Sequence, residues 1–344
     1  MTVPTARQEL ILRKVVEEYL ASGAPVGSKT LSTDPDLDCR PSTIRSELAQ
    51  LEEIGLLAHP HTSAGRVPTD AAMRFFVDGL LAAPHHPPQH RRELELSLAT
   101  REVDAAMRAT TEALSQVSSL LAIVTAPPIE TAEIRHIEVL SLQPQVLMVV
   151  IITSTGGVSK RIFTFDRPVD PGLASWAAEY LNDQLTGMDL GARTLHRRLT
   201  DPSLDPPERA FLESLMPAFT ELAATAQDTL YVDGAARLIA EHRLQDLDQI
   251  NELMTVLERR RDLLTVLRRA LTERDVLVRI GAENEAPELQ SMALVAAAYG
   301  LPARKLGTVS LMGPVRMDYA EAIVFVRDAA HQLSRFIETV YEDA

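Results

Sequence analysis

The order of patterns in residues 40–70 constrains this chain more than any other feature. The run RPSTIRSELAQLEEIG has apolar residues at helical spacing, Pro41 at a favourable first helical position and Gly55 at a natural end. On a helical wheel of about 100° per residue, Leu48 and Leu51 lie within about 20–40° of Ile44, which predicts one buried stripe. The outward face then carries Ser42, Arg45, Ser46, Ala49 and Gln50.

A turn-rich phrase, HTSAGRVPTD at residues 61–70, follows this helix. It predicts a hairpin whose first strand runs from Leu56 to His59 and whose return strand begins at Arg66 and ends at Pro68. We expect Gly65 to give the turn a residue with positive φ. The third predicted helix therefore leads directly into a β-hairpin.

Amphipathic segments on both sides of this pair complete a small domain. ARQELILRKVVEEYLASG and PVGSKTLST predict two helices before it. TDAAMRFFVDGLL predicts a closing helix that buries Phe75 and Phe76 or Leu80. Because three helices followed by a hairpin make a winged helix-turn-helix, we predict that fold for residues 1–83.

Small and hydrogen-bonding residues on the third helix indicate DNA binding. A helix in the major groove must approach closely, and it reads bases with Arg, Ser or Gln, mostly from its N-terminal half. An ordinary solvent-exposed face is the alternative for this helix alone, and the hairpin after it favours DNA because its turn would lie against the backbone. The candidate contacts are Ser28, Lys29, Ser42, Thr43, Arg45, Ser46, Gln50, His61, Thr62, Ser63 and Arg66.

The whole-chain composition limits the functions to consider. A length of 344 residues predicts two or three domains, and 46% hydrophobic with 24% charged residues is typical of a folded, soluble protein. The net charge of -14 argues mildly against nucleic acid for the chain as a whole, so DNA binding has to be a local property. We see no leader peptide and no apolar run of about 18 residues, and therefore expect a cytoplasmic protein.

We identify no candidate catalytic, metal or cofactor site in the sequence. The single cysteine, Cys39, excludes an intrachain disulfide and a cysteine-based zinc site, and an inert thiol is favoured over a redox sensor. We find no nucleophile–base pair, phosphate loop or metal-spaced carboxylate set, so we do not expect an enzyme. The phrase GPVRMDY places Arg316, Asp318 and Tyr319 after a turn, where they could line a pocket, couple two domains or serve the turn alone.

The C-terminal part mixes strand and helix patterns. EIRHIEVLSL, QVLMVVIIT and SKRIFTF predict three strands, and DVLVRIGAE, SMALVAAAYG and LGTVSLMGP predict more, before a terminal helix in AIVFVRDAAHQL. A Pro- and His-rich linker at residues 84–93 separates this part from the first domain. Strands on both sides of a helical middle predict an α+β fold interrupted by an insertion.

Several phrases resemble, in order and spacing, the HrcA family of bacterial heat-inducible transcription repressors. PVGSKTL, STIRSELAQLEEIGLL and HTSAGRVPTD carry the resemblance in the first domain, and TSTGGV, YVDGAARL, VRIGAENE and GTVSLMGPVRMDY extend it over almost the whole chain. The resemblance implies a homodimeric repressor that binds an inverted-repeat operator in double-stranded DNA upstream of chaperone operons. It also implies that a GroEL-type chaperonin keeps the repressor active and that heat shock relieves repression.

The same resemblance implies how the rest of the chain is divided. A GAF-like domain is expected at residues 94–190 and 246–344, with an inserted dimerising domain at 191–245. The alternative function is a winged-helix repressor that responds to a small metabolite bound in its GAF-like domain.

Overall fold

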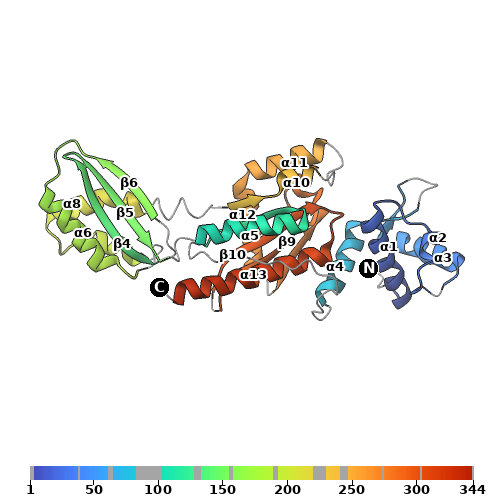
Figure 1. Cartoon of the computed structure of the whole chain (residues 1–344). Coiled ribbons are helices and arrows are strands. Elements are labelled where there is room, and N and C mark those ends of the chain that lie inside the picture. Colours follow the sequence, from blue (N-terminus) through green and yellow to red (C-terminus); the bar gives the residue numbers. More distant parts are fainter. Residues whose placement is uncertain are drawn as a thin grey trace.

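The computed structural model describes residues 4–37, 39–60, 65–82, 103–127, 133–154, 158–188, 193–219, 230–240, 247–272, 275–302 and 304–342. Among these residues, buried apolar side chains form three clusters. Figure 1 shows the three groups of helices and strands that carry these clusters following one another along an elongated molecule. We call them the N-terminal unit, the central body and the distal unit.

The N-terminal unit consists of four helices and a short hairpin. Its elements are α1 (Ala6–Ser22), α2 (Ser28–Leu31), α3 (Pro41–Glu53), β1 (Leu57–Ala58), β2 (Val67–Pro68) and α4 (Asp70–Ala82). The predicted stripe of α3 is buried, with Ile44 and Leu51 at 0% exposure and Leu48 at 3%. Strands β1 and β2 pair antiparallel, with Leu57 opposite Pro68. Because helical periodicity is a local property, the sequence predicted these elements well.

The central body is built on a five-stranded antiparallel sheet in the order β7-β3-β10-β9-β8. The strands are β3 (Leu121–Thr125), β7 (Leu230–Asp233), β8 (Val276–Ile280), β9 (Met292–Leu301) and β10 (Arg304–Pro314). The helices are α5 (Val103–Ser118), α10 (Ala235–Ala240), α11 (Leu247–Glu258), α12 (Arg260–Ala270) and α13 (Tyr319–Glu342). Both α12 and α13 pack against β9 and β10, which are buried at nearly every position, as expected for strands covered on both faces.

The distal unit has its own sheet and its own core. Strands β4 (Ile134–Gln143), β5 (Val146–Thr153) and β6 (Val158–Thr164) form an antiparallel sheet in that order. Helices α6 (Pro171–Leu185), α7 (Arg193–Leu199) and α8 (Pro206–Leu215) complete the unit. Burial alternates along β5, so one face of the sheet packs on the helices while the other is open.

The α+β class expected from the sequence is confirmed by this mixture of helices and antiparallel sheets. The grouping of the segments differs from the expected limits, because residues 134–219 form one cluster whereas the sequence assigned only 191–245 to the insertion. Strand β7, expected in the insertion, lies at the edge of the five-stranded sheet. A run of strand-forming residues identifies a strand but does not say which sheet the strand joins, and this is why the limits differ. The expected linker, residues 84–93, lies outside the described residues.

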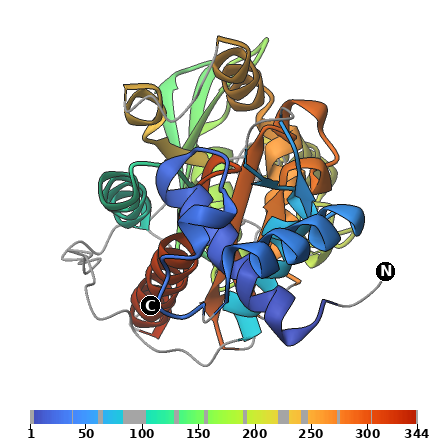
Figure 2. The same cartoon turned by 90° about the vertical axis from the view of Figure 1, so that its right-hand side faces the viewer.

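The arrangement of the N-terminal unit determines which of its faces is open. Figure 1 shows α2 and α3 at the end of the molecule, with α4 next to the central body. In Figure 2, viewed along the long axis, the blue helices of this unit lie in front of the body. The outer side of α3 therefore points away from the rest of the chain.

Candidate nucleic-acid interface

The outer face of α3 is open to solvent near the start of the helix. Ser42, Arg45 and Ser46 are exposed and Thr43 is half-buried, because the stripe on the opposite side of the helix fills the core. Pro41 occupies the first turn and Arg40 stands at the N-cap position in extended conformation. Within the described ranges, no hydrogen bond or ion pair engages the side chains of Arg40 or Arg45. This end of α3 offers small hydroxyl side chains and two cations to a partner.

Helix α2 adds a cation near the same face. Lys29 is exposed and Ser28 is half-buried, while Leu31 anchors the helix in the core of the unit. As for the two arginines, no described residue pairs with the ammonium group of Lys29. Helices α2 and α3 contact one another, so Lys29 lies on an element adjacent to α3.

Several carboxylates of this unit are engaged elsewhere. Lys14 Nζ lies 3.3 Å from Asp34 Oδ2 and 2.7 Å from Asp36 Oδ2. These hydrogen bonds, that of Asp36 foremost, raise the pKa of Lys14 above its ordinary value. Glu52, in the last turn of α3, pairs with Arg66. Asp34, Asp36 and Glu52 are therefore paired, whereas Arg40 and Arg45 near the start of α3 have no partner among the described residues.

Gln50 is exposed but is already hydrogen-bonded to another helix. Its Oε1 accepts a hydrogen bond of 2.8 Å from Gln8 Nε2, which also donates to Glu47 at 3.0 Å. The helical wheel placed Gln50 on the outward face but could not show that α1 reaches it. Gln50 thus lies toward α1, at the edge of the open face rather than at its centre.

Arg66 folds back onto α3. Its Nε lies 2.9 Å from Glu52 Oε2, its Nη1 lies 3.3 Å from His59 Nδ1, and its side chain is 18% exposed. Its backbone also pairs with Val26 in both directions at 2.8 Å. In this arrangement Arg66 fixes the hairpin to the helices, and its guanidinium does not extend outward.

The predicted tip of the hairpin is only partly described. His61, Thr62 and Ser63 lie outside the described residues. The prediction of a positive φ at Gly65 is wrong, since this residue is not among the glycines in the left-handed region. Gly65 is required for space instead, because a Cβ there would lie 2.5 Å from the backbone of Val26. The pairing of Val26 with Arg66 explains this close approach and could not be seen in the local sequence.

The three residues of the GPVRMDY phrase point into three different environments. Arg316 Nη1 donates to Gly23 O at 3.1 Å, and its guanidinium lies 5.7 Å from the ring centre of Tyr19. Asp318 accepts from Glu321 N at 3.0 Å in the first turn of α13. Tyr319 is buried, which raises its pKa, and its hydroxyl donates to Val315 O at 2.6 Å. These side chains do not line one pocket, and Arg316 faces the N-terminal unit.

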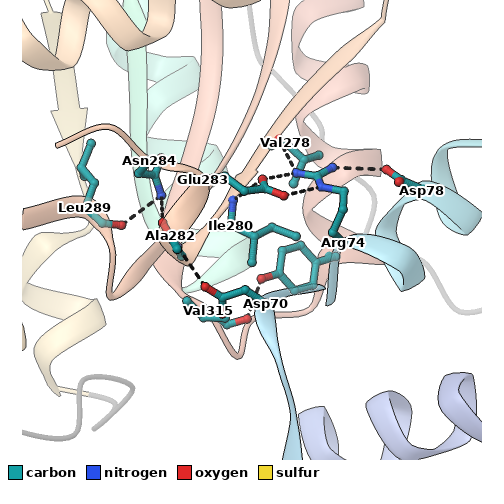
Figure 3. Close-up of polar contacts among 12 residues, drawn as sticks. Asp70, Arg74, Asp78, Val278, Ile280, Ala282, Glu283, Asn284, Leu289 and Val315 are labelled. Atoms are coloured by element: carbon teal, nitrogen blue, oxygen red, sulfur yellow. Dashed lines mark hydrogen bonds and ion pairs between the residues drawn. The ribbon is translucent and has the colours of Figure 1, made fainter. Parts of the chain in front are cut away.

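A group of polar contacts that sequence reasoning missed joins α4 to the central body (Figure 3). Arg74 Nε donates to Glu283 Oε1 at 2.6 Å, and Arg74 Nη2 donates both to Glu283 Oε2 and, at 2.7 Å, to Val278 O. Asp70 Oδ2 accepts from Ala282 N at 2.9 Å. Arg74 and Glu283 are 209 positions apart, so no local pattern connects them.

Two other kinds of site were sought in the described part of the chain. No cluster of three His, Cys, Asp or Glu side chains there is arranged to hold a metal ion. No helix of the described segments is both long enough and apolar enough to cross a membrane.

Comparisons with known proteins agree on one family. The model of the HrcA protein C terminal domain matches residues 104–323. The heat-inducible transcription repressor HrcA of Xylella fastidiosa (strain M12) is 33% identical over 334 residues, covering 97% of this chain and 96% of the relative. That of Novosphingobium aromaticivorans is 33% identical over 348 residues, covering 98% of each chain. A crystal structure described as that of a hypothetical protein matches 98% of this chain and 100% of its own with a TM-score of 0.67 at 20% identity, which shows a shared fold.

Proposed function

This chain belongs to the HrcA family of heat-inducible transcription repressors, and from that membership we propose that it represses heat-shock genes by binding their DNA with its N-terminal unit. The observation that carries the proposal is the outer face of α3. Ser42, Arg45 and Ser46 are exposed there, and the cations of this face have no partner among the described residues. A repressor of this kind acts in the cytoplasm, where the chromosome lies.

We propose that α1 to α3 with β1 and β2 form a winged helix-turn-helix in which α3 enters the major groove. Arg45 reads a base edge, while Ser42, Thr43 and Ser46 permit the close approach. Lys29 and Ser28 contact phosphates from α2. Arg66 holds the hairpin against α3 through Glu52, so that its contribution to DNA binding is to place the hairpin tip.

A dimer is needed for specificity, because one recognition helix reads only a few base pairs. Two of them in a symmetric dimer read both arms of an inverted repeat, about 34 Å or a multiple apart. The open face of the distal sheet supports this proposal, since large apolar side chains are exposed there. They are Leu140 at 38%, Leu142 at 49%, Val158 at 66% and Ile162 at 60%. We propose that two copies pair through this face, which places the dimerising function in residues 134–219.

The central body takes the remaining part of the proposal. We assign it the GAF-like fold that the family resemblance implies, and we propose that a GroEL-type chaperonin acts on the repressor and that heat shock relieves repression. A second candidate function, response to a metabolite, is favoured by an open cavity of about 460 Å³ between β9 and α13. Asp275 and Arg327 pair with each other at this cavity, which leaves fewer groups free for a ligand.

The test of the proposal is binding to DNA by the full chain. Fluorescence anisotropy would compare a duplex carrying the inverted repeat upstream of the chaperonin genes with a scrambled duplex, at one fixed salt concentration. We expect binding of the inverted repeat to be at least about a thousandfold tighter. Equal affinity for both duplexes would overturn the proposal. An effect of added chaperonin supports the first candidate, whereas an effect of metabolite extract alone supports the second.

A further inference from the structure

Helix α4 is shared between two cores. Its Ala72 is buried with the cluster of the N-terminal unit, whereas Met73 and Val77, at 1% and 0% exposure, are buried with the cluster of the central body. Phe75 and Phe76 were predicted to be buried, but both side chains are only half-buried. Val16 of α1 joins the body's cluster as well. Apolar burial of this kind resists relative motion, whereas domains joined only by a linker move freely.

A forked ion pair between Arg74 and Glu283 adds an interaction that depends on the relative orientation of α4 and the central body. Arg74 contacts both carboxylate oxygens of Glu283 and also donates to Val278 O, so the planar guanidinium has one favourable orientation. The side chains of Arg74 and Glu283 are each 27% exposed. Burial alone would raise the pKa of Glu283, but hydrogen bonds from Arg74 and Ile280 N outweigh it and hold the pKa below its ordinary value. The pair is therefore charged at neutral pH.

The turn at Gly281–Glu283, which carries Glu283, also approaches α4 closely. Gly281 has a φ of +51°, and a Cβ there would lie 2.1 Å from Asp70 Oδ2. This space lets Asp70, the first residue of α4, accept the hydrogen bond from Ala282 N. Asn284, at 4% exposure, secures the turn from below by donating to Leu289 O and Met292 O at 3.0 and 3.1 Å. Figure 3 shows the contacts of Asp70 with Ala282 and of Asn284 with Leu289 close to the pair of Arg74 and Glu283.

A separate contact lies at the end of α1. Arg316, in the loop before α13, donates to Gly23 O and covers the ring of Tyr19. A Cβ at Gly23, which has a φ of +66°, would lie 2.3 Å from Arg316 Nη1, so a side chain there would make the guanidinium shift. Contacts on two helices, α1 and α4, fix rotation as well as distance.

We propose that Asp70, Arg74, the Gly281–Glu283 turn and Arg316 form a rigid anchor that sets the orientation of the N-terminal unit on the central body. Arg74 and Glu283 are positioning residues for operator binding, since they touch no DNA and act through the placement of α3. The inference rests on the proposed function, because it assigns the anchor a role in the spacing of two DNA-binding units.

The consequence of a rigid anchor is a strict requirement for operator spacing. Each inserted base pair moves one arm by about 3.4 Å along the duplex and rotates it by about 35°. Two units that keep a fixed orientation on their central bodies follow such a change less well than two loosely attached units. The gain from simultaneous binding of both arms is about 10²–10⁴-fold, so its loss is easily measured.

The experiment compares operator duplexes with zero to five extra base pairs between the arms, together with a duplex carrying one arm. Glu283→Ala removes the anchor's ion pair. Glu285→Ala is the matched control, because Glu285 lies only two residues after Glu283. It forms an exposed forked ion pair with Arg269, with N–O distances of 2.7 and 2.8 Å. The charge exchange Arg74→Glu with Glu283→Arg tests for rescue.

We expect the wild type and Glu285→Ala to bind the native spacing at least tenfold more tightly than the altered ones. Glu283→Ala should lose about tenfold on the native spacing, bind all spacings within about threefold, and keep its affinity for one arm. The charge exchange should restore part of the spacing preference. An unchanged spacing profile in Glu283→Ala would overturn the proposal, as would an equal loss on one arm.

A measurement without DNA separates failure of the anchor from failure of the proposed function. Spin labels at Thr33→Cys and Arg335→Cys, both exposed positions, in a Cys39→Ser background report the distance between the N-terminal unit and α13 by double electron–electron resonance. We expect a narrow distribution that Glu283→Ala broadens and Glu285→Ala does not. Equal widths in all three proteins would contradict the anchor even if DNA binding is confirmed. Broadening in a chain that binds no operator would support the anchor and refute the function.

Discussion

The two sides of the N-terminal unit differ in how their charges are satisfied. On the outer side, Lys29, Arg40 and Arg45 have no partner among the described residues. On the inner side, Arg74 pairs with Glu283 and Asp70 caps the turn of the central body. A free cation at the surface is available to a phosphate or a base, whereas a paired, half-buried one holds two elements together. The comparison supports the proposals that the outer side recognises DNA and that the inner side positions the unit.

The largest effect is expected from Gly281→Ala, which should lower the free energy of unfolding by disturbing the contact of α4 with the central body. A Cβ at a positive φ costs about 1–2 kcal/mol, and displacement of Asp70 from Ala282 N costs about 1.5–3 kcal/mol more. Chemical denaturation would measure the loss. Gly55→Ala is the control, since Gly55 also has a positive φ of +81° but no atom within 4 Å of the added Cβ. Equal losses of stability in the two variants would show that the contact with Asp70 does not stabilise the protein.

A smaller effect, confined to binding, is expected from Arg45→Ala on the outer side. Stability should stay within about 0.5 kcal/mol because the side chain is exposed and has no partner among the described residues. Operator binding should weaken by about 1–3 kcal/mol, with discrimination lost at one base pair of each arm. Anisotropy on a set of single-base variants would measure both. If all base variants lose affinity equally, Arg45 contacts phosphate and the assignment of base reading is wrong.

The smallest effect is expected from Arg66→Ala, which tests the boundary between the two sides. Loss of its pair with Glu52 should cost about 1 kcal/mol or less of stability, and operator affinity should fall modestly because the hairpin is less well placed. The dependence of affinity on salt should not change. A salt slope reduced by about one, as Lys29→Ala should show, would mean that Arg66 reaches a phosphate after all.

The sequence predicted the outer side better than the inner side, and the reason is physical. Ile44, Leu48 and Leu51 recur at helical spacing, so their burial and the exposure of Arg45 follow from one local period. The pairing of Arg74 with Glu283 depends on two segments that meet only in the folded chain. From the local sequence, a charged residue in a helix is predicted to be exposed to solvent. No local signal shows whether it pairs instead with a residue far away in the sequence.

The same limit explains the remaining differences. Strands β4 to β6 were recognised as runs rich in strand-forming residues, but their separation from the five-stranded sheet depends on which helices cover them. The sequence led to the expectation that Arg66 contacts DNA. It did not reveal the pairing of Arg66 with Glu52, which belongs to the preceding helix and lies 14 positions before it. Pairing across a tertiary contact redirected the side chain, although the hairpin itself was predicted where its two short strands are found.

The most direct test of recognition by the outer face of α3 is crosslinking from that face to DNA. A photoreactive residue in place of Ser46 would be compared with one in place of Glu17, which is exposed on α1, each in the full chain with inverted-repeat DNA. We predict a crosslink to bases of both arms from position 46 and none from position 17. A crosslink from position 17 without one from position 46 would contradict the account.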